Sequence, residues 1–188
     1  PGIKNCPKEH PCFEFGLTYD GKFVSVTRSP CRKANEQMKY QNYFICRDFD
    51  DEMIGKTLND VNKTKTRNPL LIKMINLIKG EAKDWLYIRG SFNSGRTYMA
   101  TCFSTTYALE CSNPVAFCDT SKLIEDLKAL NIKNKEQFAN KLSALQSCPL
   151  LVLDGFGNEF ISEFNFTQVI YPLLSERFRK GLLTVFTS

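Results

Sequence analysis

The stretch from Gly90 to Thr97, "GSFNSGRT", has most of the residues of a phosphate-binding loop of the form G-x-x-x-x-G-K-[ST]. Gly90, Gly95 and Thr97 match, but Arg96 replaces the lysine that normally reaches the β- and γ-phosphates. Glycines let backbone amides point inward at an anion, and the threonine hydroxyl is suited to Mg²⁺. We therefore predict a site for ATP or ADP with Mg²⁺, and whether Arg96 permits binding stays open. The predicted loop residues are Gly90, Asn93, Ser94, Gly95, Arg96, Thr97 and Tyr98.

A second acidic feature lies further along the chain, where Asp154 ends the apolar run "LLVLD". A carboxylate at the end of a buried strand is suited to hold Mg²⁺ through water. ATPases of this kind usually follow that aspartate with a second acid that positions the attacking water, and here the next residue is Gly155. Because the lysine and the second acid are replaced at one site, we expect weak or no ATP hydrolysis.

The elements around these residues are predicted to alternate between strands and helices. A strand at 85–89 leads directly into the loop, and a helix follows it, which is the setting a phosphate-binding loop requires. Such alternation predicts a parallel sheet with helices on both faces. The predicted strands are 85–89, 114–119, 149–154 and 182–188, and the predicted helices are 69–80, 97–109, 121–130, 136–146 and 166–181, the last kinked or restarted at Pro172.

Composition limits the class of protein. The chain has 188 residues, a net charge of +5 and 43% hydrophobic residues, which allows a real core and is only mildly basic. No apolar run approaches the roughly 20 residues of a membrane span. Eight cysteines are compatible with secretion and disulfides, but the missing secretory signal and the phosphate-loop pattern favour a reducing cytoplasm. A start at Pro-Gly and an end on a predicted strand indicate a fragment.

From Asp154 onward the chain resembles the bacterial primosomal helicase loaders of the DnaI/DnaC type, which are AAA+ proteins, and the resemblance extends back to about Ile54. It implies an AAA+ P-loop core, incomplete at its C-terminus. It also implies that Glu159 joins Asp154 as a catalytic residue and that Thr187 or Ser188 senses the γ-phosphate. The matching residues of this last stretch are Asp154, Gly157, Glu159, Glu176, Arg177, Arg179, Thr187 and Ser188.

The first residues resemble the branch of that family that carries a small zinc module before the ATPase. Asp20-Gly21 lies between β-prone runs and predicts a hairpin. Three thiolates and an imidazole are a normal structural zinc set, and a metal would explain how so small a module holds together. The implied Zn²⁺ ligands are Cys6, His10, Cys12 and Cys31, with Cys46 in place of His10 as the alternative.

These patterns predict three parts: a Cys-rich helicase-docking module at 1–50, a linker at 51–68, and a partial AAA+ core at 69–188. The resemblance implies a cytoplasmic primosomal helicase loader that binds the replicative DNA helicase, with single-stranded DNA as a further ligand. Arg177, Arg179 and Lys180 are candidates for phosphate contacts, or else solvated helix residues. Two alternatives remain: a transposase-helper ATPase, and an inactive adaptor that keeps the ATPase fold as a docking surface.

Overall fold

The computed structural model describes residues 13–19, 24–30, 43–82, 84–158 and 162–188. It divides into two compact units, Pro1–Asn42 and Tyr43–Ser188. Five of the predicted site residues lie outside the described residues, so their predicted roles stay predictions: Cys6, His10, Cys12, Cys31 and Glu159.

The first unit contains a hairpin. Strands β1 (Phe13–Tyr19) and β2 (Val24–Pro30) pair antiparallel, and their register runs from Phe13 opposite Pro30 to Tyr19 opposite Val24. The β-prone runs on either side of Asp20-Gly21 therefore form the two strands that the sequence predicts.

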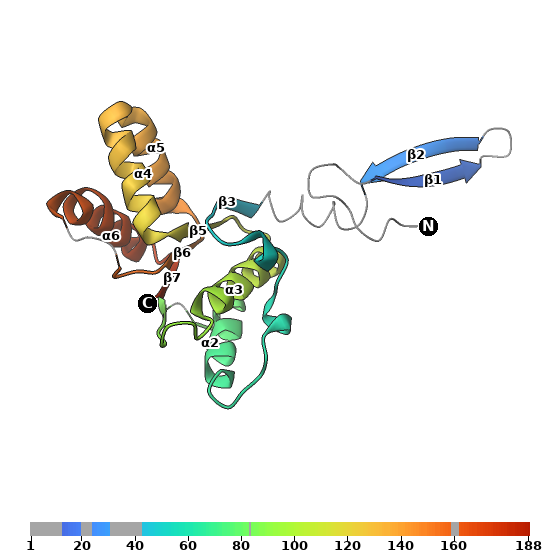
Figure 1. The fold of residues 1–188 in the computed structure, drawn as a ribbon, viewed down its shortest axis with the longest axis horizontal. Helices are drawn as coiled ribbons and strands as arrows, with labels where there is room; N and C mark the ends of the chain where they lie inside the picture. The colour runs from blue at the N-terminus through green and yellow to red at the C-terminus, as the bar shows by residue number, and fades with distance from the viewer. Residues whose placement is uncertain (1–12, 20–23, 31–42, 83, 159–161) are drawn as a thin grey trace. The chain divides into compact units, whose positions relative to one another are not determined.

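The second unit is built on a five-stranded sheet whose neighbouring strands are all parallel. Its strand order is β3-β5-β6-β7-β4, so the strand that precedes the phosphate loop, β4, lies at one edge and β3 at the other. The sheet is shown with its helices in Figure 1. Its strands are β3 (Phe44–Arg47), β4 (Leu86–Ile88), β5 (Val115–Asp119), β6 (Leu150–Asp154) and β7 (Leu183–Thr187).

The helices of this unit follow the predicted order. The last predicted helix is restarted, because a π-helical segment, η3, precedes Pro172 in the first turn of α6. Helices α4 and α5 lie side by side (Figure 1). The helical elements are η1 (Asp51–Met53), η2 (Leu58–Asp60), α2 (Asn68–Ile78), α3 (Arg96–Cys111), α4 (Thr120–Lys133), α5 (Lys135–Ser147), η3 (Asn165–Ile170) and α6 (Tyr171–Arg179).

The core has two layers because successive strand residues point to opposite faces of a sheet. Along β6, Leu150 and Val152 pack with α2 and α3, whereas Leu151 and Leu153 pack with α4, α5, η3 and α6. All four leucine and valine side chains are fully buried, as a strand covered on both faces requires. The predicted parallel sheet with helices on both faces is therefore confirmed.

Residues 51–68 contribute to this core. Leu58 and Val61 are buried in the same cluster as α2 and α3. The backbone N–H of Leu58 also donates to Thr106 Oγ1 of α3, at 2.9 Å. This stretch, which the sequence patterns assign to a linker, packs against the sheet unit, and that unit begins at Tyr43.

Arg177 is a structural residue rather than a surface cation. It is fully buried, and its guanidinium donates to the carbonyls of Leu145, Cys148 and Leu183 and to Thr184 Oγ1. The prediction that Arg177 contacts phosphates or solvent is therefore wrong, because helix α6 turns this side chain inward to satisfy the carbonyls at the end of α5. Burial lowers its pKa to about 10. Arg179 and Lys180 are exposed.

Candidate nucleotide-binding site

The predicted site residues meet at the carboxyl end of the sheet. Strand β4 leads into the loop, β6 ends at Asp154, and β7 ends at Thr187. Since β7 lies between β6 and β4 and all three run parallel, their ends share one edge of the sheet. The backbone N–H of Ser188 donates to the carbonyl of Ile88 at 3.2 Å, which ties the end of β7 to the start of the loop.

Asp154 joins the two halves of the site through two threonine hydroxyls. Thr97 Oγ1, in the first turn of α3, donates to both carboxylate oxygens at 3.1 and 3.0 Å. Thr187 Oγ1 donates to Asp154 Oδ1 at 2.5 Å. The hydroxyl and carboxylate that P-loop proteins use around Mg²⁺ are thus in direct contact, as the sequence motifs require.

The loop backbone has the conformation that an anion site needs. Gly95 has φ +83° and Asn93 has φ +60°, so the chain curls back before α3 begins at Arg96. A Cβ placed on Gly90 would lie 2.5 Å from Ser94 Oγ, so any other residue there would have to displace the Ser94 hydroxyl. The N-terminus of a helix with 16 residues then adds its positive end to the loop.

The Arg96 side chain folds back and contacts the backbone of the phosphate loop. Its Nη1 donates to the carbonyl of Gly90 at 2.8 Å. A lysine in this position would present a mobile point charge, whereas the planar guanidinium here has one of its donors engaged by backbone. Nucleotide binding would require this side chain either to keep the contact and offer its other donors, or to release Gly90.

Gly155 replaces the second acid and also determines the turn after β6. Its φ is +69°, in the left-handed region, and its backbone N–H donates to Thr187 Oγ1 at 3.0 Å. This left-handed conformation turns the chain sharply after β6. The next backbone N–H, that of Phe156, donates to the Thr187 carbonyl at 2.8 Å. An acidic residue at this position would have to adopt a conformation that L residues disfavour.

Two further residues border the loop. Tyr98 donates its hydroxyl to the carbonyl of Asp60 at 3.3 Å, so it faces the η2 segment, and burial is the main cause that raises its pKa. Arg67 was missed by the sequence patterns: its Nη2 lies 3.8 Å from where a Cβ on Gly95 would be. Arg67 belongs to no sequence motif. It lies near the loop only because of the way residues 58–68 fold.

The arrangement brings together the groups that polyphosphate sites use. It has a curled glycine loop, a helix N-terminus, two nearby arginines and a threonine-carboxylate pair for Mg²⁺. The predicted residues Gly90, Asn93, Ser94, Gly95, Arg96, Thr97 and Tyr98 all lie in the segment 90–98 at the carboxyl end of the sheet. Thr187 reaches the site through Asp154, whereas Ser188 is tied by its backbone to Ile88.

No family model matches the chain. Across its length it is similar to the replicative helicase loader DnaI of Bacillus subtilis (strain 168), with 24% identity over 195 residues. The alignment covers 98% of this chain and 61% of that protein, so the chain spans about three fifths of this curated relative. The resemblance to DnaI/DnaC-type loaders that the motifs indicate is confirmed by an alignment that covers nearly all of this chain.

Solved structures agree on the fold. A crystal structure of the DnaC helicase loader has a TM-score of 0.66 at 23% identity and covers 74% of this chain and 79% of its own. A crystal structure of DnaI has a TM-score of 0.66 at 24% identity, with 79% and 80% covered. AMPPCP-bound DnaA from Aquifex aeolicus has a TM-score of 0.61 at 13% identity, with 75% and 43% covered. The predicted fold, which these replication proteins share, is confirmed.

Proposed function

We propose that this chain, an AAA+ protein that resembles the DnaI/DnaC-type helicase loaders, delivers a replicative DNA helicase to DNA during replication. The observation that carries the proposal is its similarity to a replicative helicase loader across 98% of its residues. This similarity favours a loader over a transposase-helper ATPase. The proposed compartment is the cytoplasm, on the similarity to a replicative helicase loader. Among the described residues, none of the helices could span a bilayer.

Helicase binding is proposed for the first unit, Pro1–Asn42, with Zn²⁺ held by Cys6, His10, Cys12 and Cys31. Single-stranded DNA is proposed as a ligand of the AAA+ unit. Both proposals rest on the family resemblance. Of the basic residues at the end of α6, only Arg179 and Lys180 are exposed and able to reach phosphates, since Arg177 is buried.

Nucleotide binding is proposed at the loop, with Mg²⁺ held by Thr97 and Asp154. When bound, Mg²⁺ would neutralise charge on the terminal phosphates. The amides between Gly90 and Thr97 would hold the phosphates, and Arg67 and Arg96 would supply positive charge. Thr187 would orient the Asp154 carboxylate, to which it already donates.

A second candidate is an adaptor that does not hydrolyse ATP. Two observations favour it: Arg96 is engaged by the carbonyl of Gly90, and Gly155 occupies a left-handed turn in place of a water-positioning acid. In this version nucleotide binds weakly and stabilises the protein without turnover. The two versions share the helicase as partner and differ in chemistry.

The test of the shared proposal is a pull-down of the full chain with the replicative helicase from the same source, in the presence and absence of ATP and Mg²⁺. We expect a complex on size exclusion, and helicase transferred to a single-stranded template in a strand-displacement assay. A chain that is folded by circular dichroism but binds no helicase under either condition would contradict the loader function. Steady-state hydrolysis with and without helicase and DNA separates the two candidates.

A further inference from the structure

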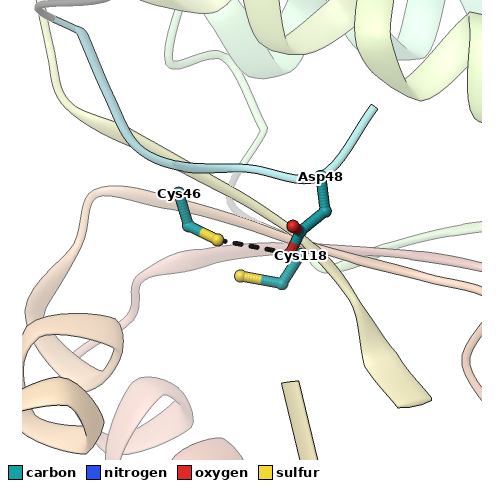
Figure 2. A group of neighbouring side chains, drawn as sticks. All are labelled: Cys46, Asp48 and Cys118. Carbon is teal, nitrogen blue, oxygen red and sulfur yellow. Dashed lines mark hydrogen bonds between the residues drawn. The ribbon is translucent and has the colours of Figure 1, made fainter. Parts of the chain in front are cut away.

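Two cysteines and an aspartate meet at the edge strand β3, which lies at the other side of the sheet from β4 and the phosphate loop. Cys46 lies in the edge strand β3, Cys118 in the neighbouring strand β5, and Asp48 just after β3. One ligand atom from each lies within 4.8 Å of the other two. Figure 2 shows the two sulfur atoms and the carboxylate facing one another. The cluster belongs to neither the loop nor the Asp154 network.

We propose that Cys46, Asp48 and Cys118 bind a divalent metal ion of the zinc class, with a water molecule as the fourth ligand. Each thiol would lose its proton to solvent as its Sγ binds the ion, while the carboxylate binds through one oxygen without a change in protonation. Thiolate, thiolate and carboxylate are a normal ligand set for Zn²⁺.

The distances fit the ion closely. Zn–S bonds of about 2.3 Å in a tetrahedron place two sulfur atoms about 3.8 Å apart. The ligand atoms lie no more than 4.8 Å apart in this structure. The two sulfur atoms would therefore have to approach by at most about 1 Å to bind one ion. The Cys46 thiol already donates to Asp48 Oδ2 at 3.3 Å, near the separation that two ligands of one ion would have.

The backbone holds the three ligands in place. Cys46 is paired in register with Ala116, and Arg47 with Phe117, so Cys46 and Cys118 belong to adjoining strands of one ladder. The N–H of Asp48 donates to the carbonyl of Phe117 at 2.9 Å. Little ordering is thus left for a metal to impose, which favours binding.

The charges near the cluster also suit a metal. Two thiolates and one carboxylate around a divalent ion leave one net negative charge. Lys122 offsets it, because its Nζ lies 2.5 Å from Asp48 Oδ1 and leaves Oδ2 directed at Cys46. A ligating carboxylate held through its second oxygen is the arrangement that orients such ligands in known metal sites.

Access is provided by an open hollow of about 490 Å³ beside the cluster. Asp48 and Lys122 line it together with Arg47, Phe49, Asp50 and Asp119. Cys118 is buried, while Cys46 and Asp48 are half-buried. Asp48 is the one ligand of the three that lines this hollow, so we expect an ion and its water ligand to enter from its side. The bound ion would link the edge strand β3 to β5.

The experiment compares metal content in the full chain, purified under reducing conditions and loaded with Co²⁺ or Zn²⁺. The variants are Asp48→Asn, Cys118→Ser and Cys46→Ser, and circular dichroism checks that each is folded. We expect each to lose one metal ion per chain and part of the thiolate-to-cobalt absorbance. Cys111→Ser is the matched control, because this half-buried thiol lies outside the cluster and contacts the carbonyl of Ile78.

Asp48→Asn is the decisive variant because it keeps the size and position of a half-buried side chain. It also separates this site from the proposed N-terminal zinc set, for which Cys46 is an alternative ligand but Asp48 is not. Added Zn²⁺ should raise the melting temperature of the parent chain more than that of Asp48→Asn. Equal metal content in the two proteins, loss in Cys46→Ser alone, or a Cys46–Cys118 disulfide in the purified protein would overturn the proposal.

Discussion

At the residue scale, Arg96 controls what the loop offers to phosphates. The change Arg96→Lys would free the carbonyl of Gly90, which now accepts from Nη1, and present a compact ammonium to the β- and γ-phosphates. We expect ATP with Mg²⁺ to bind about tenfold more tightly, which corresponds to about 1.4 kcal/mol. Titration with a fluorescent ATP analogue measures this.

The control for this change is Arg89→Lys, which alters an exposed arginine at the end of β4, before the loop. It should leave affinity unchanged. Equal or weaker binding by Arg96→Lys would show that the arginine is itself a phosphate ligand and that its contact with Gly90 opens on binding.

Arg177 carries the second prediction at this scale. Arg177→Met would leave the carbonyls of Leu145, Cys148 and Leu183 without the guanidinium that now binds them inside the core. We expect the free energy of unfolding to fall by about 3 kcal/mol, measured by urea denaturation.

The matched control is Arg179→Met, on the same helix. Arg179 is exposed and pairs with Glu176, and surface pairs contribute about 0–1 kcal/mol. A similar loss in both variants would mean that the buried network is not what stabilises this end of α5.

At the element scale, the turn after β6 determines which residues the site can accept. Gly155→Asp would supply the missing acid, but the φ of +69° is unfavourable for an L residue. We expect a loss of about 1 kcal/mol in stability and no increase in ATP turnover. Gly155→Asn has a similar backbone cost without a carboxylate, since Asn and Asp enter the left-handed region more readily than other L residues. A rise in hydrolysis with Gly155→Asp alone would contradict this account and show that the turn adapts to the acid.

The strand ends are coupled through one hydroxyl. Thr187→Val keeps the shape of a buried side chain but removes the donor to Asp154 and the acceptor for the Gly155 N–H. We expect a loss of about 1–3 kcal/mol in thermal or urea unfolding, since a half-buried N–H loses its acceptor. Thr184→Val would be a poor control because Thr184 binds Arg177. Thr167→Val, on an exposed residue of η3, is suitable.

At the scale of the whole molecule, the proposed nucleotide site lies at the ends of three strands of one sheet. A ligand that binds only the folded state should therefore stabilise the entire 43–188 unit. At about 100 times its dissociation constant it would add about 2.7 kcal/mol. We expect ATP with Mg²⁺ to raise the melting temperature of the full chain, and Asp154→Asn to remove most of that rise. A rise that is unchanged in Asp154→Asn would place the nucleotide elsewhere.

Much of this protein follows from local sequence. The strand–loop–helix order at 85–109, the buried strand ending at Asp154, and the restart at Pro172 are each encoded in a few neighbouring residues, because periodicity, glycine and proline act over short distances. The order of the motifs was enough to predict that Thr97 and Asp154 share one edge of a parallel sheet, and they are in contact.

Other features depend on contacts between residues distant in the chain, and no local pattern announces them. The inward turn of Arg177, the packing of Leu58 and Val61 into the core, the approach of Arg67 to Gly95, and the meeting of Cys46 with Cys118 are of this kind. The left-handed turn at Gly155 belongs with them, since it depends on the end of β7. Composition cannot distinguish a buried arginine from an exposed one, because burial is decided by which carbonyls the folded chain brings within reach.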